Sequence, residues 1–223
     1  FSSIDVFFNA LHGEYGEDGT VQRFLETSGV PYTGSRPLAA GVAMNKLLTK
    51  RAVLPYGIKV PRHEVLEVSD DLDQRLFDLF RSFPQPSVTK PLDRGSSVGV
   101  TIARDFESLR AGARKAFEYS PRVLVEEYIK GKEATCGVID DFRDERHYAL
   151  LPVEIVPARE QGFFSYDAKY HGQSEEICPG RFTGAESAEI QRLAKMVHDI
   201  TGLRHYSRSD FIISERGIYI LEV

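Results

Sequence analysis

Hydrophobic residues along the chain recur at two spacings, and the changes between them predict a succession of strands and helices. Residues 4–10 form a nearly continuous apolar run, which predicts a core strand, and a Gly-rich turn follows at residues 12–19. Apolar positions three and four apart then predict a helix over residues 20–28, with Gly29 as its stop. Strand and helix signals that alternate in this way are typical of α/β architecture.

The same two spacings predict the remaining elements. Helices are expected over residues 37–54, 71–81, 105–119 and 185–200. Strands are expected within residues 87–103 and over residues 123–125, 135–139, 148–156, 210–213 and 218–223. Because strands dominate after residue 122, the second half of the chain is predicted to be an α+β domain with a mainly antiparallel sheet.

Residues 31–35 have the composition of a linker and predict the first domain boundary. We expect a partial N-terminal α/β domain at residues 1–35, a central α+β domain at 36–121 and a C-terminal sheet domain at 122–223. The chain starts without a methionine and ends at Val223 within an apolar strand, so we expect it to be a portion of a longer protein.

The composition, 42% hydrophobic and 27% charged, is ordinary for a soluble globular protein. No apolar run approaches the roughly 18 residues that would span a bilayer, so a cytoplasmic location without a membrane partner is expected. A net charge of -5 with scattered Lys and Arg argues against binding to nucleic acid. The two cysteines, Cys136 and Cys178, are too few for a disulfide framework, and both are expected to be reduced and buried.

Residues 90–100, KPLDRGSSVGV, place a lysine at the end of a strand before a loop of small residues. Glycines and serines let backbone N–H groups approach a phosphate closely, and Lys90 supplies a charge beside it. The Gly-Lys-Ser/Thr order of a P-loop is absent. The alternative is a hairpin turn with a solvated lysine.

Residues 126–129, EEYI, follow an apolar strand and precede Gly131 and Glu133. A strand exit with exposed backbone amides, and a carboxylate a few residues later, suits a purine edge and a ribose. The alternative is that these glutamates are only solvated.

Two carboxylates are predicted to face each other across a hairpin whose loop is residues 215–217. Centring the register on Arg216 puts Asp210 opposite Glu222, with Cβ atoms about 4.5–5.5 Å apart. Because like charges repel there, a hard divalent cation such as Mg²⁺ is the natural partner. The alternative is that either carboxylate is neutralised by Arg208 or turns into water.

Residues 163–172 are too polar for a strand, and they lie in a loop of around 20 residues, a length that is uncommon in a compact domain and often indicates an active-site lid. Within it, Lys169 is a candidate to reach a terminal phosphate and Tyr170 to position a substrate. His12, in the Gly-rich turn, is a candidate acid, base or carboxylate ligand, with a structural role as the alternative.

In this order, these segments resemble the D-alanine–D-alanine ligases, a family of the ATP-grasp fold. The resemblance covers essentially the whole chain. The matching stretches are residues 12–19 (HGEYGEDG), 31–35 (PYTGS), 44–46 (MNK), 90–99 (KPLDRGSSVG), 126–133 (EEYIKGKE), 166–170 (YDAKY), 208–211 (RSDF) and 221–223 (LEV).

The resemblance implies ATP-dependent ligation of two D-alanine molecules through an acylphosphate, for synthesis of the peptidoglycan of the bacterial cell wall. It implies ATP with Mg²⁺, or alternatively Mn²⁺, as cofactors and a homodimer for the full-length protein. The nucleotide-binding residues that it implies are Lys46, Lys90, Gly95, Ser96, Ser97, Val98, Glu126, Glu127, Tyr128, Ile129, Glu133 and Lys169. The metal ligands that it implies are Asp210 and Glu222, the catalytic residues are Ser96, Lys169, Tyr170 and Arg208, and the substrate-binding residues are His12, Tyr170 and Arg208.

This chain departs from the family pattern at both ends. The family has an earlier glutamate in a hydrogen-bond network with Ser96 and Tyr170, and after the equivalent of Val223 it has an asparagine as third metal ligand. Both substrate half-sites are therefore expected to be incomplete in the chain as written. The alternatives are a D-alanine–D-lactate or D-alanine–D-serine ligase, against which Tyr170 speaks, and a non-catalytic nucleotide-binding relative.

Overall fold

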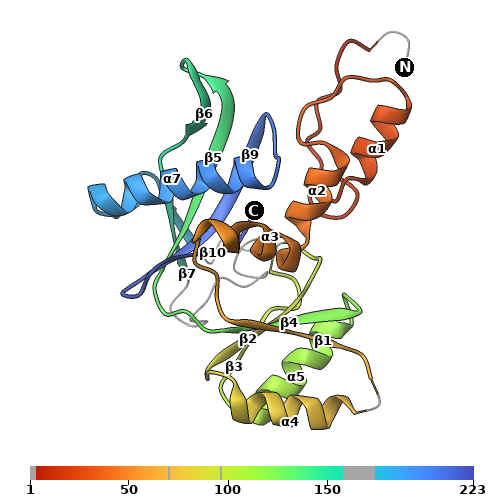
Figure 1. Cartoon of the computed structure of the whole chain (residues 1–223), viewed down its shortest axis with the longest axis vertical. Helices are drawn as coiled ribbons and strands as arrows, with labels where there is room; N and C mark the ends of the chain where they lie inside the picture. Colours follow the sequence, from red (N-terminus) through yellow and green to blue (C-terminus); the bar gives the residue numbers. More distant parts are fainter. Residues whose placement is uncertain (1–3, 70, 96, 158–173) are drawn as a thin grey trace. The chain divides into compact units, whose positions relative to one another are not determined.

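The computed structural model describes residues 4–69, 71–95, 97–157 and 174–223 (Figure 1). The chain divides into two compact units. The first unit is made of residues 1–59, 132–156 and 176–223, and the second is made of residues 60–131 and 157–175. In the described part of the chain, no helix is long and apolar enough to cross a membrane.

A six-stranded sheet in the order β10-β9-β5-β7-β8, with β6 paired to β5, forms the centre of the first unit. Its strands are β5 (Lys132–Phe142), β6 (Glu145–Ala149), β7 (Val153–Pro157), β8 (Ser174–Ile177), β9 (Tyr206–Ser214) and β10 (Gly217–Glu222). The pairs β10–β9, β9–β5, β5–β6 and β5–β7 are antiparallel, which confirms the predicted mainly antiparallel sheet. Helix α7 (Gly184–Ile200) packs on β5, β6 and β9.

The prediction of a single helix over residues 37–54 is wrong, because the helix is interrupted at Asn45. Helix α2 (Pro37–Met44) ends there, α3 (Lys46–Val53) begins, and the short 3₁₀ helix η1 (Leu54–Tyr56) follows. Asn45 has extended backbone angles, and its side chain accepts a hydrogen bond from the Leu48 N–H at 3.1 Å. Asn45 is thus the N-cap of α3, and Lys46 lies in the first turn of that helix.

The core strand predicted over residues 4–10 is also wrong within the described residues. Only an isolated parallel bridge joins Phe7 to Tyr32, and Phe8 is 71% exposed. An apolar run needs a neighbouring strand to form a ladder, and here it has a single bridge. Helix α1 (Thr20–Thr27) is confirmed, and Gly29 follows it with a positive φ of 67°.

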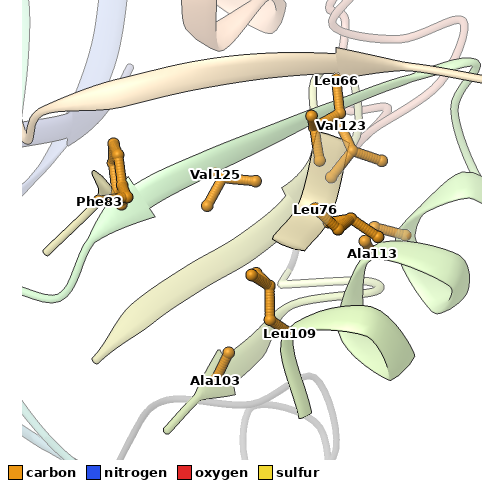
Figure 2. Close-up of a cluster of buried hydrophobic side chains, with 9 residues drawn as sticks. Leu66, Leu76, Phe83, Ala103, Leu109, Ala113, Val123 and Val125 are labelled. Carbon is orange, nitrogen blue, oxygen red and sulfur yellow. The ribbon is translucent and has the colours of Figure 1, made fainter. Parts of the chain in front are cut away.

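The second unit is a four-stranded antiparallel sheet in the order β1-β4-β2-β3. Its strands are β1 (His63–Glu67), β2 (Ser87–Pro91), β3 (Thr101–Ala103) and β4 (Arg122–Glu127), and its helices are α4 (Leu72–Ser82) and α5 (Phe106–Phe117). Figure 2 shows the core of this unit, where side chains from the sheet and both helices meet. Helix α5 begins at a capping box formed by Asp105 and Ser108.

Several further features differ from the predictions. β4 pairs with β1 and β2 in the second unit, rather than joining the C-terminal sheet as predicted. The strand predicted over residues 148–156 is two strands, β6 and β7, which lie on opposite sides of residues 150–152. Of the two cysteines, Cys136 is buried as predicted, but Cys178 is exposed because it lies past the end of β8. The two predicted domain boundaries stay predictions.

Candidate functional site

The turn of the β9–β10 hairpin differs from the predicted one. Gly217 pairs with Ser214 and Ile218 with Ile213, so the turn contains only residues 215–216. The predicted three-residue loop and its register are therefore wrong by one residue along this part of the hairpin. Gly217 has a positive φ of 116°, and its carbonyl accepts a hydrogen bond from the Ser214 hydroxyl at 2.9 Å.

A β-bulge then brings the two carboxylates opposite each other. Ile220 pairs with Phe211, the next pair is Glu222 with Asp210, and the register shifts between these two pairs. In an unbroken register Leu221 would pair with Asp210, so the extra residue moves Glu222 into that position. The predicted opposition of Asp210 and Glu222 is confirmed, although the register that produces it was not foreseen.

Each carboxylate of this pair has a cationic partner. Lys46 Nζ lies 3.0 Å from Glu222 Oε2, and Arg208 Nε lies 3.2 Å from Asp210 Oδ1. Since like charges at opposed strand positions repel, these two cations offset the repulsion. The alternative that Arg208 neutralises Asp210 is therefore also correct, because Asp210 both lies opposite Glu222 and pairs with Arg208.

A second lysine of α3 contacts the bulge itself. Lys50 is fully buried, and its ammonium donates a hydrogen bond to the Leu221 carbonyl at 3.2 Å. Lys50 follows Lys46 by four residues, so the two side chains share one face of the helix. Lys50 was not among the residues predicted from the sequence, although this spacing is a signal that could have indicated it.

Three carboxylates act on Arg208. Asp210 is the largest cause of a raised pKa at Arg208, burial opposes the rise, and Glu222 and Glu17 add to it. Glu17 belongs to the Gly-rich turn at residues 12–19, and the sequence analysis gave it no role. His12, in the same turn, is exposed. The guanidinium of Arg208 therefore stays protonated and lies in a strongly acidic environment.

In the second unit, Lys90 forms a buried ion pair with Glu126. The Nζ of Lys90 lies 2.6 Å from Oε2 of Glu126, and the two side chains are 8% and 3% exposed. The register pairs Lys90 with Leu124 and Val88 with Glu126, so the charged residues are diagonal neighbours on one sheet face. The alternative of a solvated lysine is wrong, and Glu126 orients the Lys90 ammonium.

The small-residue loop after β2 has two backbone hydrogen bonds of its own. Val98 N–H donates to the Gly95 carbonyl and Val100 N–H to the Ser97 carbonyl, both at 3.3 Å. Gly99 has a positive φ of 70°, and a Cβ there would lie 3.0 Å from side-chain atoms of Pro91 and Tyr119. The loop therefore requires glycine at that position. Ser96 lies outside the described residues.

Two backbone amides at the end of β4 are not exposed as predicted. The Glu127 N–H donates to the Arg62 carbonyl at 2.9 Å, and the Tyr128 N–H donates to the Pro86 carbonyl at 3.0 Å. These two amides are therefore used inside the unit, which corrects the expectation that they are exposed. Ile129 is 3% exposed.

The remaining predicted site residues lie elsewhere. Glu133 is in β5 of the first unit, where it pairs with Ile212 and Ile155. Lys169 and Tyr170, within the predicted lid, lie outside the described residues.

Two family models match the chain over most of its length. Residues 53–223 match the model described as D-ala D-ala ligase C-terminus, and residues 1–35 match the model described as D-ala D-ala ligase N-terminus. The chain belongs to the D-alanine–D-alanine ligase family. Proteins of this family are ATP-dependent ligases of peptidoglycan synthesis, which confirms the predicted enzyme class.

Curated relatives agree with the family models. The D-alanine–D-alanine ligase of Syntrophobacter fumaroxidans is 40% identical over 221 residues, covering 98% of this chain and 69% of the relative. That of Geobacter sulfurreducens is 40% identical over 222 residues, covering 99% of this chain and 66% of the relative. The chain therefore spans about two thirds of the length of these ligases.

Solved structures of the family have the same fold. The VanG D-Ala:D-Ser ligase from Enterococcus faecalis has a TM-score of 0.85 at 30% identity, covering 98% of this chain and 62% of that chain. The D-alanine–D-alanine ligase from Bacillus anthracis has a TM-score of 0.80 at 32% identity, covering 99% of this chain and 68% of that chain. The predicted ATP-grasp fold is confirmed.

Proposed function

We propose that the full-length protein joins two D-alanine molecules into D-alanyl-D-alanine in a reaction driven by ATP. One observation carries this proposal: Asp210 and Glu222 oppose each other with Lys46 and Arg208 beside them. Phosphoryl transfer needs positive charge collected and positioned where negative charge develops, and this group of residues supplies both the cations and their orientation. The names of the curated relatives support D-alanine as the substrate.

The donor set of Asp210 and Glu222 fits a divalent cation such as Mg²⁺, with Mn²⁺ as the alternative. Carboxylate oxygens are the ligands that these hard cations prefer, and the bulge places one carboxylate from each strand at opposed positions. When bound, such a cation neutralises charge on the phosphates of ATP. Lys46, 3.0 Å from Glu222, supplies further positive charge at this position.

In this proposal, two lysines bind phosphate groups and one arginine stabilises the reacting groups. Lys46 and Lys90 bind phosphate oxygens by charge-assisted hydrogen bonds, and burial of Lys90 strengthens its contact. Glu126 keeps the Lys90 ammonium in position. Arg208 stabilises the charge that develops on the reacting carboxylate and phosphoryl groups, and its raised pKa ensures that it stays protonated.

The remaining assignments rest on family membership. Gly95, Ser97 and Val98, with Ser96, cover the phosphates. Residues 126–129 bind the adenine and Glu133 the ribose, while Lys169 approaches the γ-phosphate. Ser96, Tyr170, Arg208 and His12 order the first D-alanine. The carboxylate of that D-alanine takes the γ-phosphoryl group, and the amine of the second D-alanine attacks the acylphosphate and releases phosphate.

A product assay tests the proposal. The full-length protein is incubated with ATP, Mg²⁺ and D-alanine, and the products are identified by mass spectrometry. We expect phosphate release that requires D-alanine and yields the dipeptide. Phosphate release without D-alanine, or no release at all, would reject the proposal.

A D-alanine–D-serine ligase is the second candidate, because the VanG D-Ala:D-Ser ligase matches the fold with a TM-score of 0.85. Equal concentrations of D-alanine and D-serine in one assay separate the two candidates. D-alanyl-D-alanine as the main product supports the first, whereas D-alanyl-D-serine as the main product supports the second.

A further inference from the structure

A cluster of two histidines and an aspartate lies in the first unit, on residues that the proposed ligase reaction does not use. Asp140 of β5 and His147 of β6 are paired in the antiparallel register, and His198 lies in the last turn of α7. Asp140 Oδ1 lies 2.7 Å from His147 Nδ1 and 3.0 Å from His198 Nε2. We propose that Asp140, His147 and His198 form a binding site for a transition-metal ion such as Zn²⁺.

The three ligand atoms already lie close together. They all lie within 4.8 Å of one another, from three different secondary-structure elements. Bond lengths of about 2.0–2.1 Å around tetrahedral Zn²⁺ place ligand atoms roughly 3.3 Å apart. The distances from Asp140 to the two imidazoles, 2.7 and 3.0 Å, are shorter than this, so both must widen by roughly 0.3–0.6 Å when the ion binds.

Each imidazole is also held through its second ring nitrogen. His147 Nε2 lies 3.3 Å from Asp199 Oδ1, and His198 Nδ1 lies 2.7 Å from Ser207 Oγ. Metal-binding histidines usually have such an outer partner, which fixes the ring orientation and leaves the other nitrogen directed at the metal. The cluster thus has both the ligands and the supporting hydrogen bonds of a metal site.

The burial of His198 points in the same direction. Its side chain is fully buried, and within the part of the chain that the structure describes, no hydrogen bond of acceptable geometry reaches Nε2. Burial lowers the pKa of His198, although the charge of Asp140 opposes this. A buried imidazole nitrogen that lies beside a carboxylate and lacks a well-aligned hydrogen bond is placed to donate its lone pair to a metal ion.

The third proposed ligand is the carboxyl group of Asp140. Burial acts to raise the pKa of Asp140, but hydrogen bonds from His147 and from the backbone N–H of His205 hold it below its ordinary value. Asp140 therefore provides a carboxylate beside two imidazoles. Imidazole ligands favour Zn²⁺ and its neighbours over Mg²⁺, so this site differs in metal preference from Asp210 and Glu222.

A bound ion would join the β5–β6 hairpin to α7. Because the three ligands are assembled only in the folded chain, an ion bound there stabilises the folded state over the unfolded state. We therefore expect Zn²⁺ to raise the thermal midpoint without being required for the ligase chemistry.

Calorimetry tests this site. Tag-free full-length protein is freed of metal with EDTA, dialysed, and titrated with Zn²⁺ in the presence of saturating Mg²⁺ and ADP. One equivalent of Zn²⁺ should bind and raise the thermal midpoint, and Co²⁺ in its place should show the ligand-field absorption of a tetrahedral site. The absence of saturable Zn²⁺ binding would overturn the proposal.

Variants locate the ion. His147→Gln should abolish the binding, and Asp199→Asn, which alters an outer partner of His147 and an exposed ion pair with Arg146, should weaken it by about 10- to 100-fold. Asp199 is 56% exposed, so this variant keeps the fold even if changes at His147 do not. His205→Asn and Asp210→Asn are controls that should retain the site. Zn²⁺ affinity that is unchanged in His147→Gln and Asp199→Asn, or that is lost in Asp210→Asn, would overturn the assignment.

Discussion

The buried ammonium of Lys50 donates a hydrogen bond to the backbone carbonyl of Leu221, the residue at which the register of β10 shifts. The bulge formed there sets Glu222 opposite Asp210. A side chain of α3 therefore supports the register on which the proposed metal ligands depend.

Replacing Lys50 with methionine should lower the free energy of unfolding by roughly 1.5–3 kcal/mol, the usual contribution of a hydrogen bond to a charged group. Methionine is of similar length, so loss of the hydrogen bond dominates over loss of packing. Affinity for ATP with Mg²⁺ should fall as well, because Glu222 is less firmly held. Urea unfolding and calorimetry measure the two effects. Arg51→Met, at the exposed next position, is the control and should change neither.

The two proposed metal ligands should respond differently to loss of charge. Asp210→Asn and Glu222→Gln are both expected to abolish ligation in the full-length protein. Glu222→Gln should also be the more destabilising, by about 1–3 kcal/mol, because it removes the charge beside the buried ammonium of Lys46. Ligation rates and thermal midpoints of both variants test this. Full activity in either variant would remove that residue from the metal site.

Loss of Lys90 should act on nucleotide binding. Lys90→Met is expected to weaken binding of a non-hydrolysable ATP analogue by roughly 10- to 150-fold, since a charge-assisted contact contributes about 1.5–3 kcal/mol. Calorimetry in Mg²⁺ measures the affinity. Arg110→Met, which breaks an exposed ion pair with Glu107 in the same unit, is the control. Equal affinities for the Lys90 variant and the control would mean that Lys90 does not bind phosphate.

The two cysteines should differ sharply in reactivity. Burial raises the pKa of the Cys136 thiol to about 12, so almost no thiolate forms at pH 8, whereas Cys178 is exposed. Treatment with iodoacetamide at pH 8 should therefore modify Cys178 and leave Cys136 unmodified until the protein unfolds. Peptide mass spectrometry reads the sites directly. Equal modification of both thiols in the folded protein would contradict the buried position of Cys136.

Glu154 should contribute to acid sensitivity. Hydrogen bonds from Arg181 hold the pKa of Glu154 below its ordinary value of 4.5. A lowered folded pKa contributes stability that is present above pH 4.5 and is lost as the pH falls through the folded value. Urea unfolding from pH 7 down to pH 3 should thus show a shallower loss of stability for Glu154→Gln than for the unchanged protein.

A variant of an exposed ion pair tests whether burial of the Glu154 pair is needed for its effect on acid stability. Glu189 also pairs with an arginine, Arg192, but its side chain is 43% exposed, whereas that of Glu154 is 7% exposed. Solvent screening weakens the exposed pair, so Glu189→Gln should leave the pH dependence nearly unchanged. A larger effect at Glu189 than at Glu154 would contradict this account.

Local sequence was sufficient where an element depends on its own residues. Helices α1, α4, α5 and α7 follow the predicted spacing because each has one apolar face, and α5 and α7 also begin at capping boxes. The break at Asn45 was missed because residues 37–44 are all apolar or glycine, so they give no periodic signal that could end at Asn45. β1 was missed because its residues, including His63 and Glu64, are mostly polar and only Leu66 is buried.

The sequence by itself determined the family, the enzyme class and the residue types of the site, because these depend on which chemical groups occur in which order. It also indicated that Asp210 and Glu222 meet, since a hairpin limits the possible partners of each strand residue. Only the tertiary structure decided how they meet. The two-residue turn shifts the pairing by one residue from the predicted register, and the bulge shifts it back. No local pattern reveals a bulge that depends on packing against Lys50 of another element. The ion pair of Lys90 with Glu126 and the cluster of Asp140, His147 and His198 arise likewise from contacts between residues distant in sequence.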